Sequence, residues 1–114
     1  MSTFKVAALQ MRSTTSLERN VDAFEALVRD AAAQGAIYVQ SPEMTGALVR
    51  DRDSLKAMLR SEGDDPVALK AAALARELGI VVHVGSTAIA RPDGKVANRG
   101  FLFDTDGTKL ATYD

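Results

Sequence analysis

The chain of 114 residues contains no cysteine and no tryptophan, and it has a single histidine. Without cysteine, these residues offer no disulfide framework, no thiolate metal site and no cysteine nucleophile. Fourteen basic residues against fifteen acidic ones give a net charge of −1. Nucleic acids and anionic membranes both require a positive excess on one face, so neither is an expected partner.

Long apolar runs and targeting patterns are also missing. A membrane-spanning helix needs ~20 apolar residues, and no run approaches that length. The first ten residues are typical of a strand and not of a secretory signal peptide. We therefore expect a cytoplasmic protein. With 46% hydrophobic and 25% charged residues, the chain has the composition of one globular domain.

The first third of the sequence predicts a strand, a helix and a second strand. Residues 4–11 are mostly apolar and favour a buried strand. Thr15 and Glu18 form a capping box, which predicts the start of a helix. Gly35 is expected to end that helix in the left-handed conformation. Residues 36–40 then predict a short strand. The apolar stripe of the helix recurs at three- and four-residue spacing: Leu17, Val21, Phe24, Leu27, Val28 and Ala31.

The middle of the chain begins irregularly and continues with a better-defined helix. We expect an irregular loop over 44–53 and a short helix over 54–60. Asp65 before a proline predicts the N-terminus of a helix over 66–78, because aspartate caps and proline suits the first helical position. Gly79 is expected to end it.

The last third predicts a strand followed by two turns of the hairpin type. Strand 80–89 is apolar at nearly every position, which favours burial on both of its faces. Proline and Asp-Gly in 91–95 predict a turn into strand 95–103, and 104–108 predicts a second turn into strand 109–114. The order βαβαβββ favours an α/β fold in which two main helices pack against a mixed sheet.

Glu43 is the first candidate for chemistry. It follows Pro42 just beyond the short strand 36–40, and open α/β sheets bind their ligands beyond the carboxyl ends of strands. Judged by position alone, a solvated loop carboxylate is the commoner explanation.

Two other features have a structural explanation that we favour. His83 lies in the most apolar strand, where a hydrogen-bonded core histidine is commoner than a base or a metal ligand. No second ligand stands at the spacing of a zinc site. The stretch 104–107 resembles the opening of a calcium loop but lacks its later ligands, so turn formation explains it better. We expect no metal and no cofactor.

Several motifs in one order suggest a family. The stretches are Ala7-Ala8-Leu9-Gln10, Gly35 to Glu43, Ala75 to Ile80, Val84-Gly85-Ser86, and Asn98 to Asp104 with Asp106-Gly107. Together they cover nearly the whole chain and resemble the nitrilase superfamily of carbon–nitrogen hydrolases. In the strand before Pro42, Gln40 and Ser41 stand where many members have an aliphatic residue and a leucine.

The resemblance implies a fold, a substrate class and a site. It implies that 1–114 is the N-terminal part of an α-β-β-α sandwich domain that acts on a small amide or nitrile. It makes Glu43 the general base of a Glu-Lys-Cys mechanism. The lysine would follow Asp114 directly and the cysteine would lie well beyond it, so both are outside this sequence. It also implies a homo-oligomer for the full-length protein.

Two expectations follow for the chain as it stands. With one of three catalytic residues, residues 1–114 should be inactive alone. The alternative function is a non-catalytic α/β binding or interaction domain, in which Glu43 is an ordinary loop residue. A lysine and then a cysteine in the coding region after Asp114 would favour the hydrolase.

Overall fold

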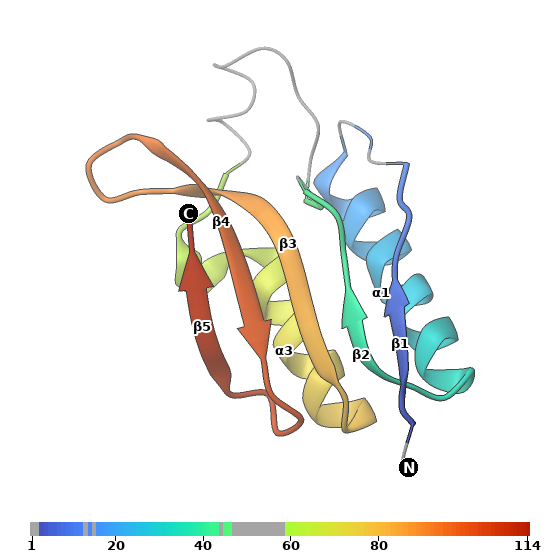
Figure 1. Cartoon of the computed structure of the whole chain (residues 1–114). Helices are drawn as coiled ribbons and strands as arrows, with labels where there is room; N and C mark the ends of the chain where they lie inside the picture. The colour runs from blue at the N-terminus through green and yellow to red at the C-terminus, as the bar shows by residue number, and fades with distance from the viewer. Residues whose placement is uncertain (1–2, 13, 15, 44, 47–58) are drawn as a thin grey trace.

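The computed structural model describes residues 3–12, 14, 16–43, 45–46 and 59–114. The described strands form one five-stranded sheet in the order β1-β2-β3-β4-β5 (Figure 1). β1 pairs with β2, and β2 with β3, in parallel, whereas β3, β4 and β5 pair antiparallel. Along the chain the elements are β1 (Lys5–Ala8), α1 (Leu17–Ala33), β2 (Ala36–Gln40), η1 (Glu62–Asp64), α3 (Pro66–Leu78), β3 (Val81–Ala90), β4 (Val96–Phe103) and β5 (Lys109–Tyr113).

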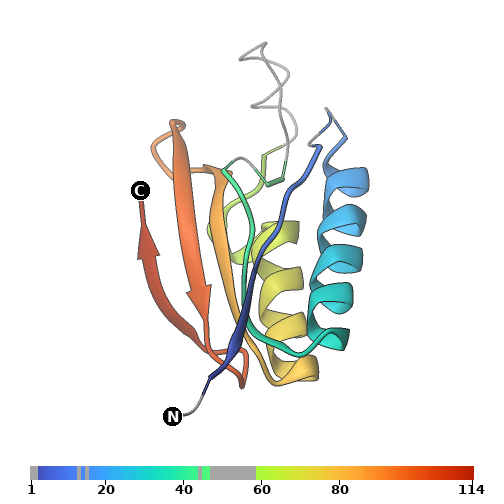
Figure 2. The same cartoon turned by 45° about the vertical axis from the view of Figure 1, so that its right-hand side comes forward.

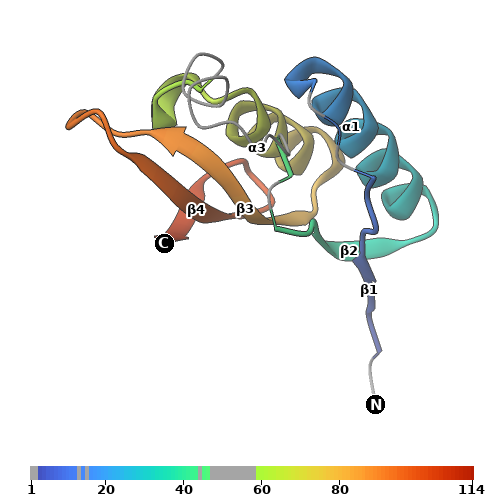
Figure 3. The ribbon, with the colours of Figure 1, turned by 90° about the horizontal axis from the view of Figure 1, so that it is seen from above.

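Helices α1 and α3 lie side by side on the same face of the sheet. Figures 2 and 3 show both helices on one side, with no described element covering the other side. The predicted α/β fold, a mixed sheet with two main helices, is therefore confirmed. The described residues supply one helix layer and one sheet layer. None of the described helices is long and apolar enough to span a membrane.

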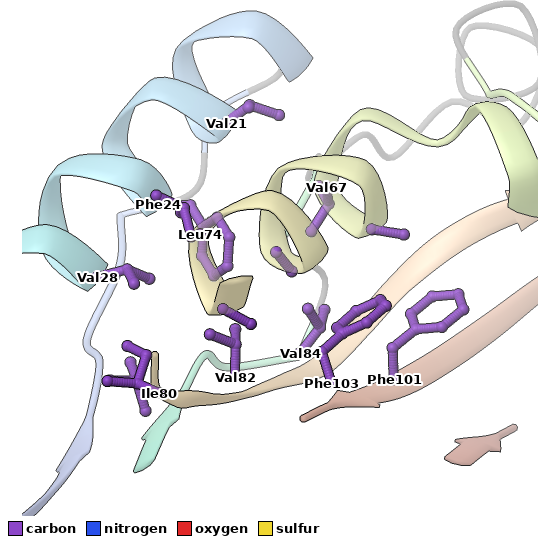
Figure 4. Close-up of a cluster of buried hydrophobic side chains, with 14 of the residues drawn as sticks. Val21, Phe24, Val28, Val67, Leu74, Ile80, Val82, Val84, Phe101 and Phe103 are labelled. Carbon is purple, nitrogen blue, oxygen red and sulfur yellow. The ribbon is translucent and has the colours of Figure 1, made fainter. Parts of the chain in front are cut away.

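The hydrophobic core lies between the helices and the sheet (Figure 4). Phe24 from α1 and Leu74 from α3 are at most 1% exposed and point down onto the strands. From the sheet, Val84 and Phe101 are fully buried, and the rings of Phe101 and Phe103 stack with their centroids 6.1 Å apart. Each such side chain contributes roughly 1.5–3 kcal/mol through burial, so this layer fixes α3 relative to β3 and β4.

Helix α3 has the bounds that the sequence predicted. The Asp65 carboxylate accepts the backbone N–H of Ala68 at 2.9 Å, and Pro66 occupies the first helical position. At the other end Gly79 has φ of 66°, and its N–H donates to the carbonyl of Ala75 at 2.9 Å. A capping carboxylate and a left-handed glycine thus define both ends.

The start of α1 differs from the prediction by one residue. The N-cap is Ser16, whose Oγ accepts the N–H of Arg19 at 3.3 Å. The predicted cap, Thr15, lies outside the described residues, and the Thr15–Glu18 capping box is wrong because the helix begins at Leu17. Either hydroxyl residue can cap a helix, so adjacent Thr and Ser leave the start ambiguous. After the helix, Gly35 has φ of 95°, as expected.

The burial predicted for strand 4–11 is wrong, and that predicted for strand 80–89 holds only in its second half. The strand expected over 4–11 is shortened to β1, and three of its four residues are exposed. β1 is an edge strand, and only one face of the sheet is covered by helices. In the first half of β3 the same asymmetry leaves Val81 and His83 half-buried, whereas Val82 and Val84 point to the helices and are fully buried. Residues 86–89 are buried at every position, as predicted.

Both predicted turns are present. Gly94 (φ 81°) and Gly107 (φ 85°) adopt the left-handed conformation that these turns require. Gly107 N–H donates to Asp104 at 2.9 Å, which closes the turn that resembled a calcium loop. The sequence did not predict η1. The loop over 44–53 and the short helix over 54–60 fall mainly outside the described residues.

Candidate functional site

Glu43 lies on a turn at the carboxyl end of β2. Because β1, β2 and β3 run in the same direction, their carboxyl ends share one edge of the sheet, the upper edge in Figure 1. The Glu43 side chain is exposed there, and no hydrogen bond or ion pair among the described residues engages its carboxylate. We call the described residues 41–43, 45 and 46 the Glu43 turn.

The first residues of the turn are fixed to β3. Ser41 N–H donates to the carbonyl of His83 at 2.9 Å, and Gly85 N–H donates back to the carbonyl of Ser41 at 3.1 Å. The parallel ladder of β2 and β3 therefore continues past the last residue of β2. The approach is so close that a Cβ on Gly85 would lie 2.3 Å from the Ser41 carbonyl oxygen. Only glycine fits at position 85 without a shift of backbone.

The far side of the turn is fixed by Thr45, which is fully buried. Its N–H donates to the carbonyl of Ser86 at 2.9 Å. Its hydroxyl donates to the carbonyl of Pro42 at 2.6 Å and lies 2.8 Å from Ser41 Oγ. One side chain thus closes the turn on itself, and its backbone joins the turn to β3.

Asn20 of α1 supports the end of the turn. Its side-chain amide donates to the carbonyls of Gly46 and Thr14, each at 2.8 Å, and is 2% exposed. A buried amide whose bonds are made is costly to replace, because an apolar substitute would leave two carbonyls unpaired. Glu43 is therefore held through the backbone on both sides, whereas its own carboxylate is left open to solvent.

A bulge in β3 lies next to this turn. The register with β4 shifts between Val84 and Thr87, so Gly85 and Ser86 include one residue more than the facing strand. Bulges of this kind locally bend a strand and re-aim the groups beside it, and they are frequent next to active sites. Here the bulge residues are the ones whose backbone bonds hold Ser41 and Thr45.

His83 is hydrogen-bonded, as predicted, but it lies away from the core. Its side chain is half-buried on the sheet face without helices, with Nδ1 2.7 Å from Tyr38 Oη and Nε2 2.6 Å from Tyr113 Oη. Burial lowers the pKa of this imidazole below its usual 6.5, which favours the neutral ring at neutral pH. Among the described residues, no cluster of three or more His, Cys, Asp or Glu could hold a metal ion.

The end of β5 reaches the same edge as the Glu43 turn (Figure 1). The guanidinium of Arg99 donates to both carboxylate oxygens of Asp114, at 2.7 and 3.2 Å. This two-bond contact holds the pKa of Asp114 below its usual range. Arg99 also contacts Glu62 of η1 at 3.3 Å.

Sequence reasoning located Glu43 but missed the residues that hold its turn. Ser41, Thr45 and Asn20 were not singled out, although each is a short polar residue near the Pro-Glu pair or in the helix opposite it. Such residues commonly bond to nearby backbone in turns, which is the signal that could have found them.

Comparison with known proteins gives a consistent result. The family model described as carbon–nitrogen hydrolase matches residues 5–114. The NitFhit protein of C. elegans has a TM-score of 0.83 and 25% sequence identity, covering 95% of this chain and 26% of that one. An amidase from Nesterenkonia sp. has a TM-score of 0.79 and 22% identity, covering 96% of this chain and 41% of that one. A mutant of that amidase in complex with butyramide gives the same TM-score and identity, with 96% and 42% covered. The chain therefore spans less than half the length of these proteins.

Proposed function

Because the chain belongs to the carbon–nitrogen hydrolase family, we propose that it is the N-terminal part of an enzyme that hydrolyses a small amide or nitrile, with Glu43 as the general base. One observation carries the proposal. Glu43 lies on a turn that is fixed on both sides by buried hydrogen bonds, and its carboxylate is exposed at the carboxyl edge of the parallel strands. A general base requires this combination of a defined position and an accessible oxygen.

The proposed chemistry needs a cysteine, which this sequence lacks. In the resemblance described above, that cysteine and a lysine lie beyond Asp114. Glu43 would accept the thiol proton while sulfur bonds to the amide carbon, and would then pass the proton to the departing ammonia. This leaves a thioester.

The second half of the reaction uses the same carboxylate. Glu43 would take a proton from water as its oxygen attacks the thioester carbon, and breaking the C–S bond would release the carboxylic acid and restore the thiol. The lysine ammonium would stabilise the oxyanion in both halves, an effect typically worth about 3–4 kcal/mol. The amide class fits the amidases among the similar proteins, whereas a nitrile would give the same thioester after one water adds and ammonia leaves.

The test is Glu43→Gln in the full-length enzyme. This change keeps the size of the side chain and removes the proton acceptor, so kcat should fall by at least a factor of about 10² with the melting temperature unchanged. Glu43→Asp withdraws the carboxylate by one methylene, so its kcat should lie between those of the wild type and of Glu43→Gln. Glu18→Gln is the matched control, because Glu18 is an exposed carboxylate on α1.

Ammonia release from a panel of short amides is the measurement. If Glu43→Gln keeps more than a tenth of the wild-type kcat, Glu43 is not the base. Residues 1–114 produced alone should release no more ammonia than a buffer blank, since they contain no cysteine. Release above the blank would contradict the proposed division of the catalytic residues.

A further inference from the structure

Three side chains form a hydrogen-bonded chain across the sheet face that no described helix covers. His83 of β3 stands between Tyr38 of β2 and Tyr113 of β5, at 2.7 Å from the first hydroxyl and 2.6 Å from the second. The imidazole meets both rings edge-on, with centroids 6.1 and 5.8 Å apart. The Tyr113 hydroxyl continues the chain to the carbonyl of Gly85 at 3.2 Å.

Tyr113 reaches His83 by passing over β4. β4 lies between β3 and β5, and the residue of β4 that pairs with Tyr113 is Gly100. A Cβ on Gly100 would lie 2.3 Å from Cζ of the Tyr113 ring. The ring therefore lies directly over a position without a side chain, and this brings its hydroxyl to β3.

Both tyrosine hydroxyls also have an acceptor away from the imidazole. Tyr38 Oη donates to Gln40 Oε1 and Tyr113 Oη donates to the Gly85 carbonyl, each at 3.2 Å. Four contacts therefore share two hydroxyl protons and one imidazole proton, and the roles of Nδ1 and Nε2 depend on which of them carries the proton.

Gly85 joins this hydrogen-bonded chain to the Glu43 turn through its backbone N–H and C=O. Its carbonyl accepts from Tyr113, and its N–H donates to Ser41, two residues before Glu43. On the opposite face of the sheet, Arg99 binds the next residue, Asp114, with two hydrogen bonds. The end of β5 is thus fixed from both faces, and on one of them it is fixed to Gly85, the residue whose N–H holds the turn.

We infer that His83 is a positioning residue, which holds the end of β5 at a set distance from the Glu43 turn through Tyr113 and the backbone of Gly85. This inference rests on the proposed function, in which the base comes from the turn and the chain continues from Asp114 toward the other catalytic residues. A displacement of about 1 Å between reacting groups can cost roughly 10²-fold in rate. The hydrogen bonds of Tyr38, His83 and Tyr113 would therefore affect catalysis by positioning, without contact with the substrate.

The test compares hydroxyl and imidazole variants of the full-length enzyme. Tyr113→Phe keeps the ring over Gly100 and removes the link to Gly85, so kcat should fall about tenfold or more, with KM within about threefold. His83→Leu should lower kcat similarly. His83→Gln retains an N–H donor and should recover part of the loss. If His83 only packed against the sheet face, His83→Leu should keep more activity than His83→Gln, because an apolar residue packs well there.

Leu102→Ala is the matched control. Leu102 faces His83 from β4 and is half-buried on the same face, but it contributes no hydrogen bond to the chain. It should lower the melting temperature and leave kcat within about twofold. If Tyr113→Phe and His83→Leu change kcat no more than Leu102→Ala does, the positioning role is overturned while the proposed function stands. A wild-type enzyme without amide or nitrile hydrolysis would overturn the proposed function and this inference together.

Discussion

Gly85 and Ser41 approach each other more closely than any side chain at position 85 would allow. The Gly85 N–H donates to the Ser41 carbonyl at 3.1 Å, and a Cβ on Gly85 would lie 2.3 Å from that oxygen and 2.8 Å from the Pro42 carbonyl carbon. The atoms in the way belong to the backbone of the Glu43 turn, so a larger residue at position 85 must displace the turn itself.

Gly85→Ala should therefore destabilise the protein and disturb the turn. Overpacking of this kind typically costs about 1–3 kcal/mol in the free energy of unfolding. The control is Gly63→Ala in η1, where a Cβ would meet nothing within 4 Å. Urea unfolding monitored by circular dichroism measures both. Equal midpoints for the two variants would show that the Gly85 backbone has more room than described.

Variants of Asp65 can distinguish the contribution of its capping hydrogen bond from that of its charge. Its carboxylate caps α3 while 2% exposed, and burial, the largest cause, raises its pKa above 3.8 despite the opposing bonds from Ala68 and Val67. A raised folded pKa means that its stabilising contribution is complete below pH 3.8 and declines as the pH rises through the folded pKa.

At pH 7, Asp65→Ala should lose about 1 kcal/mol of stability because the cap is lost. Asp65→Asn should be at least as stable as the wild type, since asparagine caps without a buried charge. Chemical unfolding at pH 7 compares the three proteins. If Asp65→Asn loses as much free energy of unfolding as Asp65→Ala does, the charge itself stabilises α3.

His83 should make stability depend on pH in the mildly acidic range. Its pKa is lowered by burial from 6.5, so the unfolded chain binds the proton more tightly. Its contribution is complete above pH 6.5 and is lost as the pH falls through the lowered folded pKa. The titratable groups in contact with it are Tyr38 from β2, whose pKa burial raises above 10.0, and Tyr113 from β5.

The measurement is the melting temperature between pH 7.5 and 5, for the wild type and for His83→Gln. The wild type should lose more than the variant over this interval, because glutamine does not titrate. Parallel curves would show that proton uptake by His83 is not coupled to unfolding.

Residues 1–114 produced alone should associate. The sheet face opposite the helices carries Val6 and Tyr113, which are 55% and 49% exposed, and every residue of the edge strand β5 is exposed. Unpaired strand edges and apolar faces of several hundred Å² promote association. Size-exclusion chromatography with light scattering, followed by a thermal melt, checks this. A monodisperse monomer with a sharp transition above ~50 °C would instead favour a self-contained domain.

The sequence predicted the elements with strong local signals. Asp65, Pro66 and Gly79 specify α3 through caps that depend only on neighbouring residues, and the turns at Gly94 and Gly107 depend on local backbone conformation in the same way. The burial of β1 and of the first half of β3 was predicted wrongly, because an apolar strand does not show whether one or both faces of its sheet are covered. That is decided by where the helices pack.

For the candidate site, the sequence located Glu43 and its place beyond β2. It did not show that Thr45 and Asn20 fix the turn, or that His83 bridges Tyr38 and Tyr113. These contacts join residues from different strands and helices, and no periodicity or motif links them. The bulge at Gly85 was equally hidden, since a glycine in a strand has several explanations.

Because the ring of Tyr113 lies over Gly100, substitutions at these two positions should be coupled in evolution. A mutation that adds a side chain at position 100 displaces the Tyr113 ring by steric overlap. In a protein without the ring, a larger residue at position 100 no longer has this overlap. If Tyr113 is replaced first, the steric requirement for glycine at position 100 is removed, and this position can then accept other residues. Descendants of this protein should therefore keep both residues or lose both, and the single replacements should be short-lived intermediates between these two solutions.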